Sequence, residues 1–157
     1  MPDFEGSGAN VFGQFPQPES NDAGAVDAAL QALRCARDEP TSKEAYDAFL
    51  WAVGNNHAGT YYPVILAVLP EIEQILVSGA AWAQRATMEA LIDLGGSFVP
   101  EVGHENHLGA SVQQTLQAFI QGMRDHIALL ANGRDARAAS ASDLLELIDD
   151  QVVMKGR

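Results

Sequence analysis

Residues 46–98 decide the fold and read YDAFLWAVGNNHAGTYYPVILAVLPEIEQILVSGAAWAQRATMEALIDLGGSF. Three stretches of helical periodicity lie almost back to back in this segment, separated only by short breaks rich in Gly, Asn, Thr and Ser. Within each stretch, apolar residues recur at spacings of three and four, which predicts amphipathic helices. The chain contains no strand-like alternation of useful length, so we expect an all-α fold.

The same periodicity, followed outward from this segment, predicts about six helices. Their expected ranges are 22–37, 41–53, 61–77, 80–94, 110–131 and 140–154. Thr41 and Glu44 have the spacing of a capping box, which predicts the start of the second helix. Short turns between helices favour antiparallel pairs stacked in sequence over one symmetric bundle. We therefore expect a single HEAT-like domain over residues 22–157.

Residues 1–21 differ from the rest in composition. They are rich in Gly, Pro, Ser and Asn and have no periodicity, which predicts a flexible N-terminal arm. This composition favours a loose segment over docking of Phe4, Phe12 or Phe15 on the domain. The N-terminus has no export-signal pattern, and Cys35 is the one cysteine. A lone thiol is typical of a reducing compartment, so we expect a cytoplasmic protein.

The charge balance indicates what kind of partner the chain could bind. The formal net charge is −12, from 21 acidic and 9 basic residues. Such a surface repels nucleic acid and anionic lipid, and the longest apolar run is far shorter than the roughly 20 residues of a spanning helix. We expect no nucleic-acid or membrane partner. The acidity would attract a basic protein, or it serves only to keep the domain soluble.

Two histidines, His104 and His107, are three residues apart in the longest internal loop. This spacing could hold a metal ion on a helix, but no third ligand is evident beside them. A polar loop is the simpler interpretation. We therefore predict no metal site.

Pairs of carboxylates could act as acid and base catalysts, or they could lie on solvated helix faces. No nucleophile motif and no phosphate-binding loop accompanies them, so we expect no enzyme activity and no cofactor. The pairs are Glu44 and Asp47, Glu71 and Glu73, and Glu89 and Asp93.

Residues 51–94 resemble the HEAT-like helical proteins that occur in bacteria beside polymorphic toxins. The likeness rests on WAVGNNHAGTYYP (residues 51–63), on VLPEIEQIL (residues 68–76) and on the helix that ends in LIDL (residues 91–94). In that group a turn of the type G-N-x-x-H-x-G-x-x-Y-P precedes a helix. The likeness covers about a third of the chain, and its motifs are structural.

The resemblance implies an immunity protein, a small cytosolic antidote that binds a cognate toxin and blocks its active site in competition between bacteria. The implied partner is a basic toxin, such as a nuclease or a nucleotide-using enzyme. Charge complementarity would steer the two proteins together. The residues expected to contact the toxin are aromatic anchors and acids: Trp51, His57, Tyr61, Tyr62, Glu71, Glu73, Trp82, Glu89 and Asp93.

Two alternatives stay open at the level of the sequence. The first is a HEAT-type adaptor or scaffold that binds an unrelated protein. A toxin gene directly upstream of the gene for this chain would favour an immunity protein over such an adaptor. The second is a metal-dependent helical hydrolase that uses His57, His104 and His107 with the carboxylates. Metal content of the purified protein would test the second.

Overall fold

The computed structural model describes residues 11–155, and it is mostly helical, as the periodicity predicts. The helices are α2 (Ala25–Cys35), α3 (Glu39–Val53), α4 (Val64–Ser78), α5 (Ala81–Gly95), α6 (Val112–Gly122), α7 (Arg124–Ala131) and α8 (Arg137–Lys155). Five two-residue strands, which the sequence did not predict, are β1 (Gly54–Asn55), β2 (Thr60–Tyr61), β3 (Val99–Pro100), β4 (Asn106–His107) and β5 (Ala110–Ser111). Within residues 11–155, no helix has both the length and the apolar character needed to cross a bilayer.

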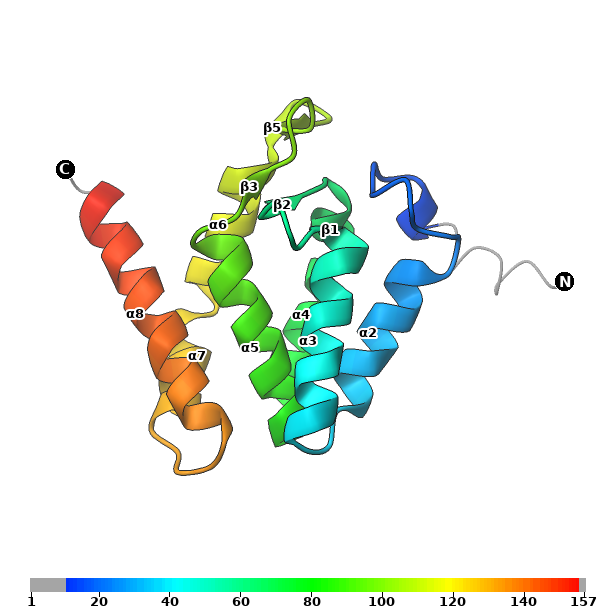
Figure 1. Ribbon diagram of the computed structural model, residues 1–157. Coiled ribbons are helices and arrows are strands. Elements are labelled where there is room, and N and C mark those ends of the chain that lie inside the picture. Colours follow the sequence, from blue (N-terminus) through cyan, green and yellow to red (C-terminus); the bar gives the residue numbers. More distant parts are fainter. Residues whose placement is uncertain (1–10, 156–157) are drawn as a thin grey trace, which may run out of the picture.

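Helix α5 is the centre of the arrangement. It packs against α2, α3, α4, α6 and α8, while α2 pairs with α3 and α7 pairs with α8 (Figure 1). The short strands gather at one end of the helices, and the turns from α2 to α3 and from α7 to α8 lie at the other end (Figure 1).

The core lies between these helices and follows the predicted apolar stripes. Leu33 of α2, Phe49 of α3, Ile65 of α4, Leu91 of α5 and Leu116 of α6 are completely or almost completely buried. Burial of one large aliphatic side chain stabilises a protein by about 1.5–3 kcal/mol, so these stripes dominate the folding free energy.

Helix α3 begins two residues earlier than its predicted capping box. The N-cap is Asp38, whose carboxylate accepts a hydrogen bond from the amide of Thr41 at 3.0 Å, while the Thr41 hydroxyl oxygen accepts one from the amide of Asp38. Pro40 fits in the first turn because amides there have no helical partner. The prediction of a box formed by Thr41 and Glu44 is therefore wrong: Thr41 is its third helical residue rather than its cap.

The predicted long helix over residues 110–131 is divided into α6 and α7. Met123 between them has φ −91° and ψ 3°, which turns the chain out of the α-helical path. The apolar stripe continues across the break, because Ile120, Met123 and Ile127 are all buried. The periodicity therefore predicted the buried face correctly but not the change of direction.

The N-terminal segment also differs from its prediction. Residues 1–10 of the expected flexible arm lie outside the described residues, but residues 11–21 are packed on the domain. Phe12 is buried, and the carbonyl of Pro16 accepts a hydrogen bond from the amide of Val64 at 3.0 Å. The Asn21 side chain donates to the carbonyl of Ala52 at 2.8 Å. The buried side chain of Phe12 gives residues 11–21 an apolar contact with the domain, and this contact helps to hold the segment in place.

Strands β1, β2 and β3 form a small sheet that joins the end of α3 to the loop after α5. β1 pairs antiparallel with β2, and β2 pairs parallel with β3. A Cβ atom at Gly54 would lie 2.0 Å from the carbonyl oxygen of Thr60. Glycine is required there because the two strands approach too closely for any side chain.

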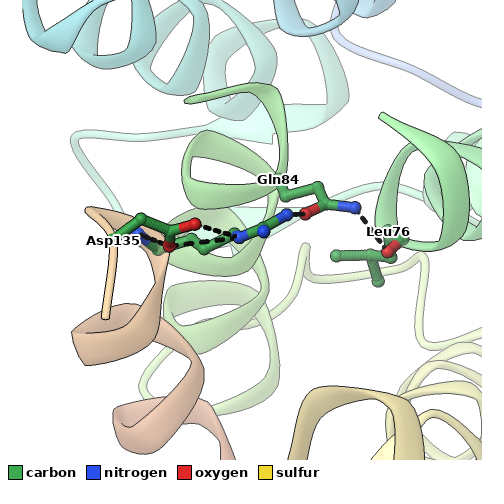
Figure 2. Close-up of polar contacts among 4 residues, drawn as sticks. Leu76, Gln84 and Asp135 are labelled. Atoms are coloured by element: carbon green, nitrogen blue, oxygen red, sulfur yellow. Dashed lines mark hydrogen bonds and ion pairs between the residues drawn. The ribbon is translucent and has the colours of Figure 1, made fainter. Parts of the chain in front are cut away.

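A buried polar network ties the last two helices to the rest. The amide of Gln84, which is 2% exposed, donates to the carbonyl of Leu76 at 2.8 Å and accepts from Arg137 (Figure 2). Arg137 also forms an ion pair with Asp135 at 2.9 Å, and the His126 ring bonds to the same Leu76 carbonyl. The network therefore links α4, α5, α7 and the start of α8.

Candidate functional site

A large open cleft lies between the first half of α3 and α5. Its volume is about 770 Å³, within the range of sites that take a ligand or a partner's side chains. Because β1 follows directly on the last residue of α3, the cleft lies toward the end of the helices opposite to the strands (Figure 1). Its lining residues are Glu39, Pro40, Ser42, Lys43, Glu44, Tyr46, Asp47, Arg85, Ala86 and Glu89.

The cap of α3 fixes the rim of this cleft. Hydrogen bonds from the Thr41 hydroxyl and amide hold the pKa of the Asp38 carboxyl below its usual value, so Asp38 stays ionised and holds the first turn in place. Helical spacing then brings Glu39, Lys43 and Asp47 to successive turns along the cleft.

Tyr46 and Asp93 connect the two walls of the cleft. The Tyr46 hydroxyl donates a hydrogen bond to the Asp93 carboxylate, and both side chains are half-buried. Burial raises the pKa of Tyr46 far above its ordinary value, and the hydrogen bond to Asp93 and the negative charges of Asp93, Asp47 and Glu89 raise it further. The phenol therefore remains neutral and remains a donor at any physiological pH.

Acidic side chains outnumber basic ones along the cleft. Glu39, Glu44, Asp47 and Glu89 contribute carboxylates, whereas Lys43 and Arg85 contribute the cations. The Arg85 guanidinium lies 5.1 Å from the centre of the Trp82 ring and 3.8 Å from the Glu39 carboxylate, so it is partly neutralised within the protein. Glu44, Asp47 and Glu89 form no ion pair with another described residue. The cleft thus presents unneutralised negative charge.

One of the nine predicted contact residues lines this cleft, and two others contact its lining residues. Glu89 is the lining residue, the Asp93 carboxylate accepts a hydrogen bond from Tyr46, and the Trp82 ring lies against the Arg85 guanidinium. The three belong to α5 and lie at spacings of seven and four residues, so helical periodicity places them along one side of that helix.

The other predicted contact residues are dispersed. Trp51 is 49% exposed near the end of α3, and His57 is exposed in the loop between β1 and β2. Glu71 and Glu73 belong to α4, where Glu71 forms an ion pair with Arg34 of α2 at 2.7 Å and Glu73 is exposed. These residues share no common surface with the cleft.

Tyr61 is a correction to the predicted contact set. Its side chain is 0% exposed, so it cannot contact a partner. Tyr61 is the last residue of β2 and points into the core, while Tyr62, just after the strand, stays half-buried at the surface. The Tyr61 hydroxyl has no hydrogen-bond partner among the described residues, and burial raises the pKa of Tyr61 to about 12.

The sequence indicates some of the cleft residues but does not predict that they lie close together in space. The sequence pairs Glu44 with Asp47 and Glu89 with Asp93, on two separate helices, and of these four it predicts only Glu89 and Asp93 as contact residues. Tyr46 is not among the predicted contact residues. Their convergence depends on how α3 packs against α5, which helical periodicity does not encode.

The two loop histidines are held by aromatic rings rather than by each other. His104 contacts Tyr62 with ring centres 5.0 Å apart, and His107 contacts Phe15 at 4.8 Å, with the ring planes tilted in both pairs. Within residues 11–155, no group of three or more His, Cys, Asp and Glu side chains has the arrangement of a metal site.

The cleft between α3 and α5 is the site that the described geometry supports best. It combines volume, exposed carboxylates and a fixed aromatic wall. Comparison of the chain with protein-family models, with curated proteins and with solved structures gives no match.

Proposed function

We propose that this chain is an immunity protein that binds a basic toxin through the acidic cleft between α3 and α5 and so blocks the toxin's active site. The observation that carries the proposal is the set of carboxylates at Glu44, Asp47 and Glu89, which lines a cleft of about 770 Å³. The identification of the partner as a toxin rests on the resemblance of residues 51–94. The formal net charge of −12 adds long-range attraction for a basic protein.

The chemistry needed for inhibition is modest. A lysine or arginine side chain of the toxin would enter the cleft and pair with Glu89 and Asp47, while the neutral phenol of Tyr46 offers no repulsion. Nuclease and nucleotide-using toxins need cationic side chains to hold phosphate, so a protein that occupies those groups removes substrate binding. No catalytic step by this chain is required.

We also propose a HEAT-like stacking of helix pairs as the finer architecture. In support, α2 and α3 pack as an antiparallel pair joined by a short turn, and α7 and α8 form a second pair (Figure 1). Helix α5 lies between the two pairs and packs against α3 and α8. The exposed side of such a stack offers a rigid surface for a partner protein.

The experiment that tests the function is capture of the partner followed by rescue from its toxicity. Tagged full-length protein is used to purify bound proteins from its native cells, and each captured protein is expressed with and without this chain. We expect one basic protein that arrests growth alone and is harmless when co-expressed. Capture of a harmless protein would contradict immunity and favour the adaptor interpretation.

Charge reversal tests the location of the interface. Glu44→Lys with Glu89→Lys should abolish rescue, because both changes place cations in the cleft. Glu146→Lys with Asp150→Lys is the matched control, since both residues are exposed on α8 and the net charge changes by the same amount. Equal loss of rescue in both double variants would show that only overall charge matters and would contradict the cleft as the site.

A further inference from the structure

Leu108 has two features that are unfavourable in the isolated protein. Its side chain is 92% exposed, the highest value among the large apolar side chains described. Its backbone has φ 51°, the left-handed region in which a side chain crowds the following carbonyl. Non-glycine residues in strained backbone regions are concentrated at functional sites.

The turn itself does not require a leucine. Strands β4 and β5 pair antiparallel, with Asn106 opposite Ser111 and His107 opposite Ala110, so Leu108 and Gly109 form a two-residue turn. Both turn residues have positive φ, as in a type I′ hairpin. Asn at the first turn position would satisfy this geometry better, because its short polar side chain tolerates the left-handed region.

A second exposed apolar residue lies in the same loop. Val102 is 85% exposed, next to Gly103 with φ 88°, and Val99 at the base of the loop is 50% exposed. Figure 1 shows the loop before β5 extending past the ends of the helices at the end where the strands gather. The loop therefore presents aliphatic side chains on a projecting, convex part of the molecule.

The base of the loop is held in place by several contacts. The Glu101 amide donates to the Tyr61 carbonyl at 2.8 Å, and the Glu101 carboxylate accepts from the Thr60 hydroxyl at 2.7 Å. The tilted ring contacts of His104 with Tyr62 and of His107 with Phe15 hold the two sides of the loop. A pre-ordered loop loses little conformational entropy when it binds.

We propose that Leu108, together with Val102, is an anchor that inserts into an apolar pocket bordered by lysine or arginine on a partner protein. The convex turn requires a concave complement. The charged residues between 99 and 111 are Glu101 and Glu105, with no lysine or arginine, so the rim of that pocket must be basic. This surface is separate from the cleft between α3 and α5, and the inference does not depend on the partner being a toxin.

The first test uses the purified protein alone and asks whether Leu108 serves the fold. Leu108→Asn should leave Tm unchanged or raise it, because Asn fits the left-handed turn and no buried contact is lost. Val102→Ser should likewise leave Tm unchanged. A clear fall in Tm for Leu108→Asn would assign the leucine to stability and overturn the inference.

The second test asks what Leu108 contacts. The photo-crosslinker p-benzoylphenylalanine is placed at position 108 of the full chain in its native cells, and at the exposed position Gln113 as control. The protein cross-linked only from position 108 is then purified and titrated with wild type and with Leu108→Asn. We expect Leu108→Asn to weaken Kd at least tenfold, with the cross-link mapped to apolar residues beside lysine or arginine.

Three results of the second test would overturn the inference. These are no cross-link specific to position 108, a cross-link to a second copy of this chain, and an unchanged Kd for Leu108→Asn. The Glu44→Lys, Glu89→Lys variant is titrated with the same protein, with and without Leu108→Asn. If the cleft plays no part in this contact, Leu108→Asn should weaken Kd by the same factor in both backgrounds.

Discussion

The hydroxyl of Tyr46 on α3 donates a hydrogen bond to the carboxylate of Asp93 on α5, which joins two helices across 47 residues of sequence. Both groups are half-buried and lie beside the acidic cleft. The bond therefore fixes the distance between the two walls on which the proposed interface depends.

This bond should be measurable as a coupling energy. Tyr46→Phe and Asp93→Asn should each lower the free energy of unfolding, and a double-mutant cycle should give a coupling of about 1–2 kcal/mol, as for hydrogen bonds to a charged group. Urea unfolding of the four proteins provides the measurement. Tyr62→Phe is the control and should change stability by less than about 0.5 kcal/mol. Additive effects of the two substitutions would show that the bond contributes nothing to stability.

Removal of the Tyr61 hydroxyl should not destabilise the protein. A buried hydroxyl without a partner costs about 1–3 kcal/mol, so Tyr61→Phe should be neutral or should raise stability by about 1 kcal/mol at pH 7. Thermal or urea unfolding would measure this. A loss of stability would instead indicate that a bound water satisfies the hydroxyl in solution.

Stability should fall as the solution becomes alkaline. A tyrosine ionises near pH 10 in the unfolded chain, whereas the folded-state pKa of Tyr46 is raised and that of Tyr61 is about 12. The unfolded state therefore binds fewer protons above pH 10, so the stability present at neutral pH is lost progressively as pH rises through the folded-state values. Urea unfolding between pH 8 and 11 should show a shallower decline for Tyr61→Phe than for wild type. Parallel curves would contradict the role of Tyr61.

Gly54→Ala should be strongly destabilising. Its Cβ would lie 2.0 Å from the Thr60 carbonyl oxygen and 2.8 Å from the Tyr61 Cα, and both of these are backbone atoms of the paired strand. We expect a loss of more than about 3 kcal/mol or failure to fold. Gly122→Ala is the matched control, because its Cβ would meet nothing within 4 Å at the end of α6, and it should gain up to about 1 kcal/mol. Circular dichroism during heating would compare the two variants.

Loss of the Gln84 amide should loosen the attachment of the last helices. Gln84→Met keeps the length of the side chain but leaves Arg137 without its amide partner and removes a donor to the Leu76 carbonyl. The expected loss is about 1 kcal/mol, the net value of a hydrogen bond, because His126 still bonds the Leu76 carbonyl and Arg137 still pairs with Asp135. Gln113→Met, at an exposed position of α6, should be nearly neutral in the same unfolding experiment. Equal stability of both variants would contradict the importance of the network.

Helical periodicity predicted the parts of the fold that depend on local burial. Val26, Leu30 and Leu33 recur at helical spacing within the first predicted helix, residues 22–37, and all three are buried. The end of α3 at Gly54 also follows the prediction, because a glycine can close a helix where the chain must approach another strand. Helical periodicity and the helix-ending glycine gave correct predictions because both depend only on residues that are close together in the sequence.

The rest depended on contacts that are distant in sequence. The break at Met123 allows α6 to pack on α4 and α5 while α7 packs on α8, and no local breaker other than Gly122 marks it. Tyr61 and Tyr62 are indistinguishable by composition, and only the pairing of β2 with β1 and β3 determines which ring is buried. The cleft requires the same kind of information, since its walls are separated by about 40 residues.

The position of α5 against α2, α3, α4, α6 and α8 has a consequence for how the protein comes apart. A long array of stacked repeats can lose its end units one at a time, because each unit touches only its neighbours, whereas in the short stack proposed here one helix contacts both helix pairs. Here the loss of α5 would expose the apolar faces of five helices together. Amide protons in α5 should therefore exchange with solvent only when the whole molecule opens, and the domain should unfold in one step rather than fray from one terminus.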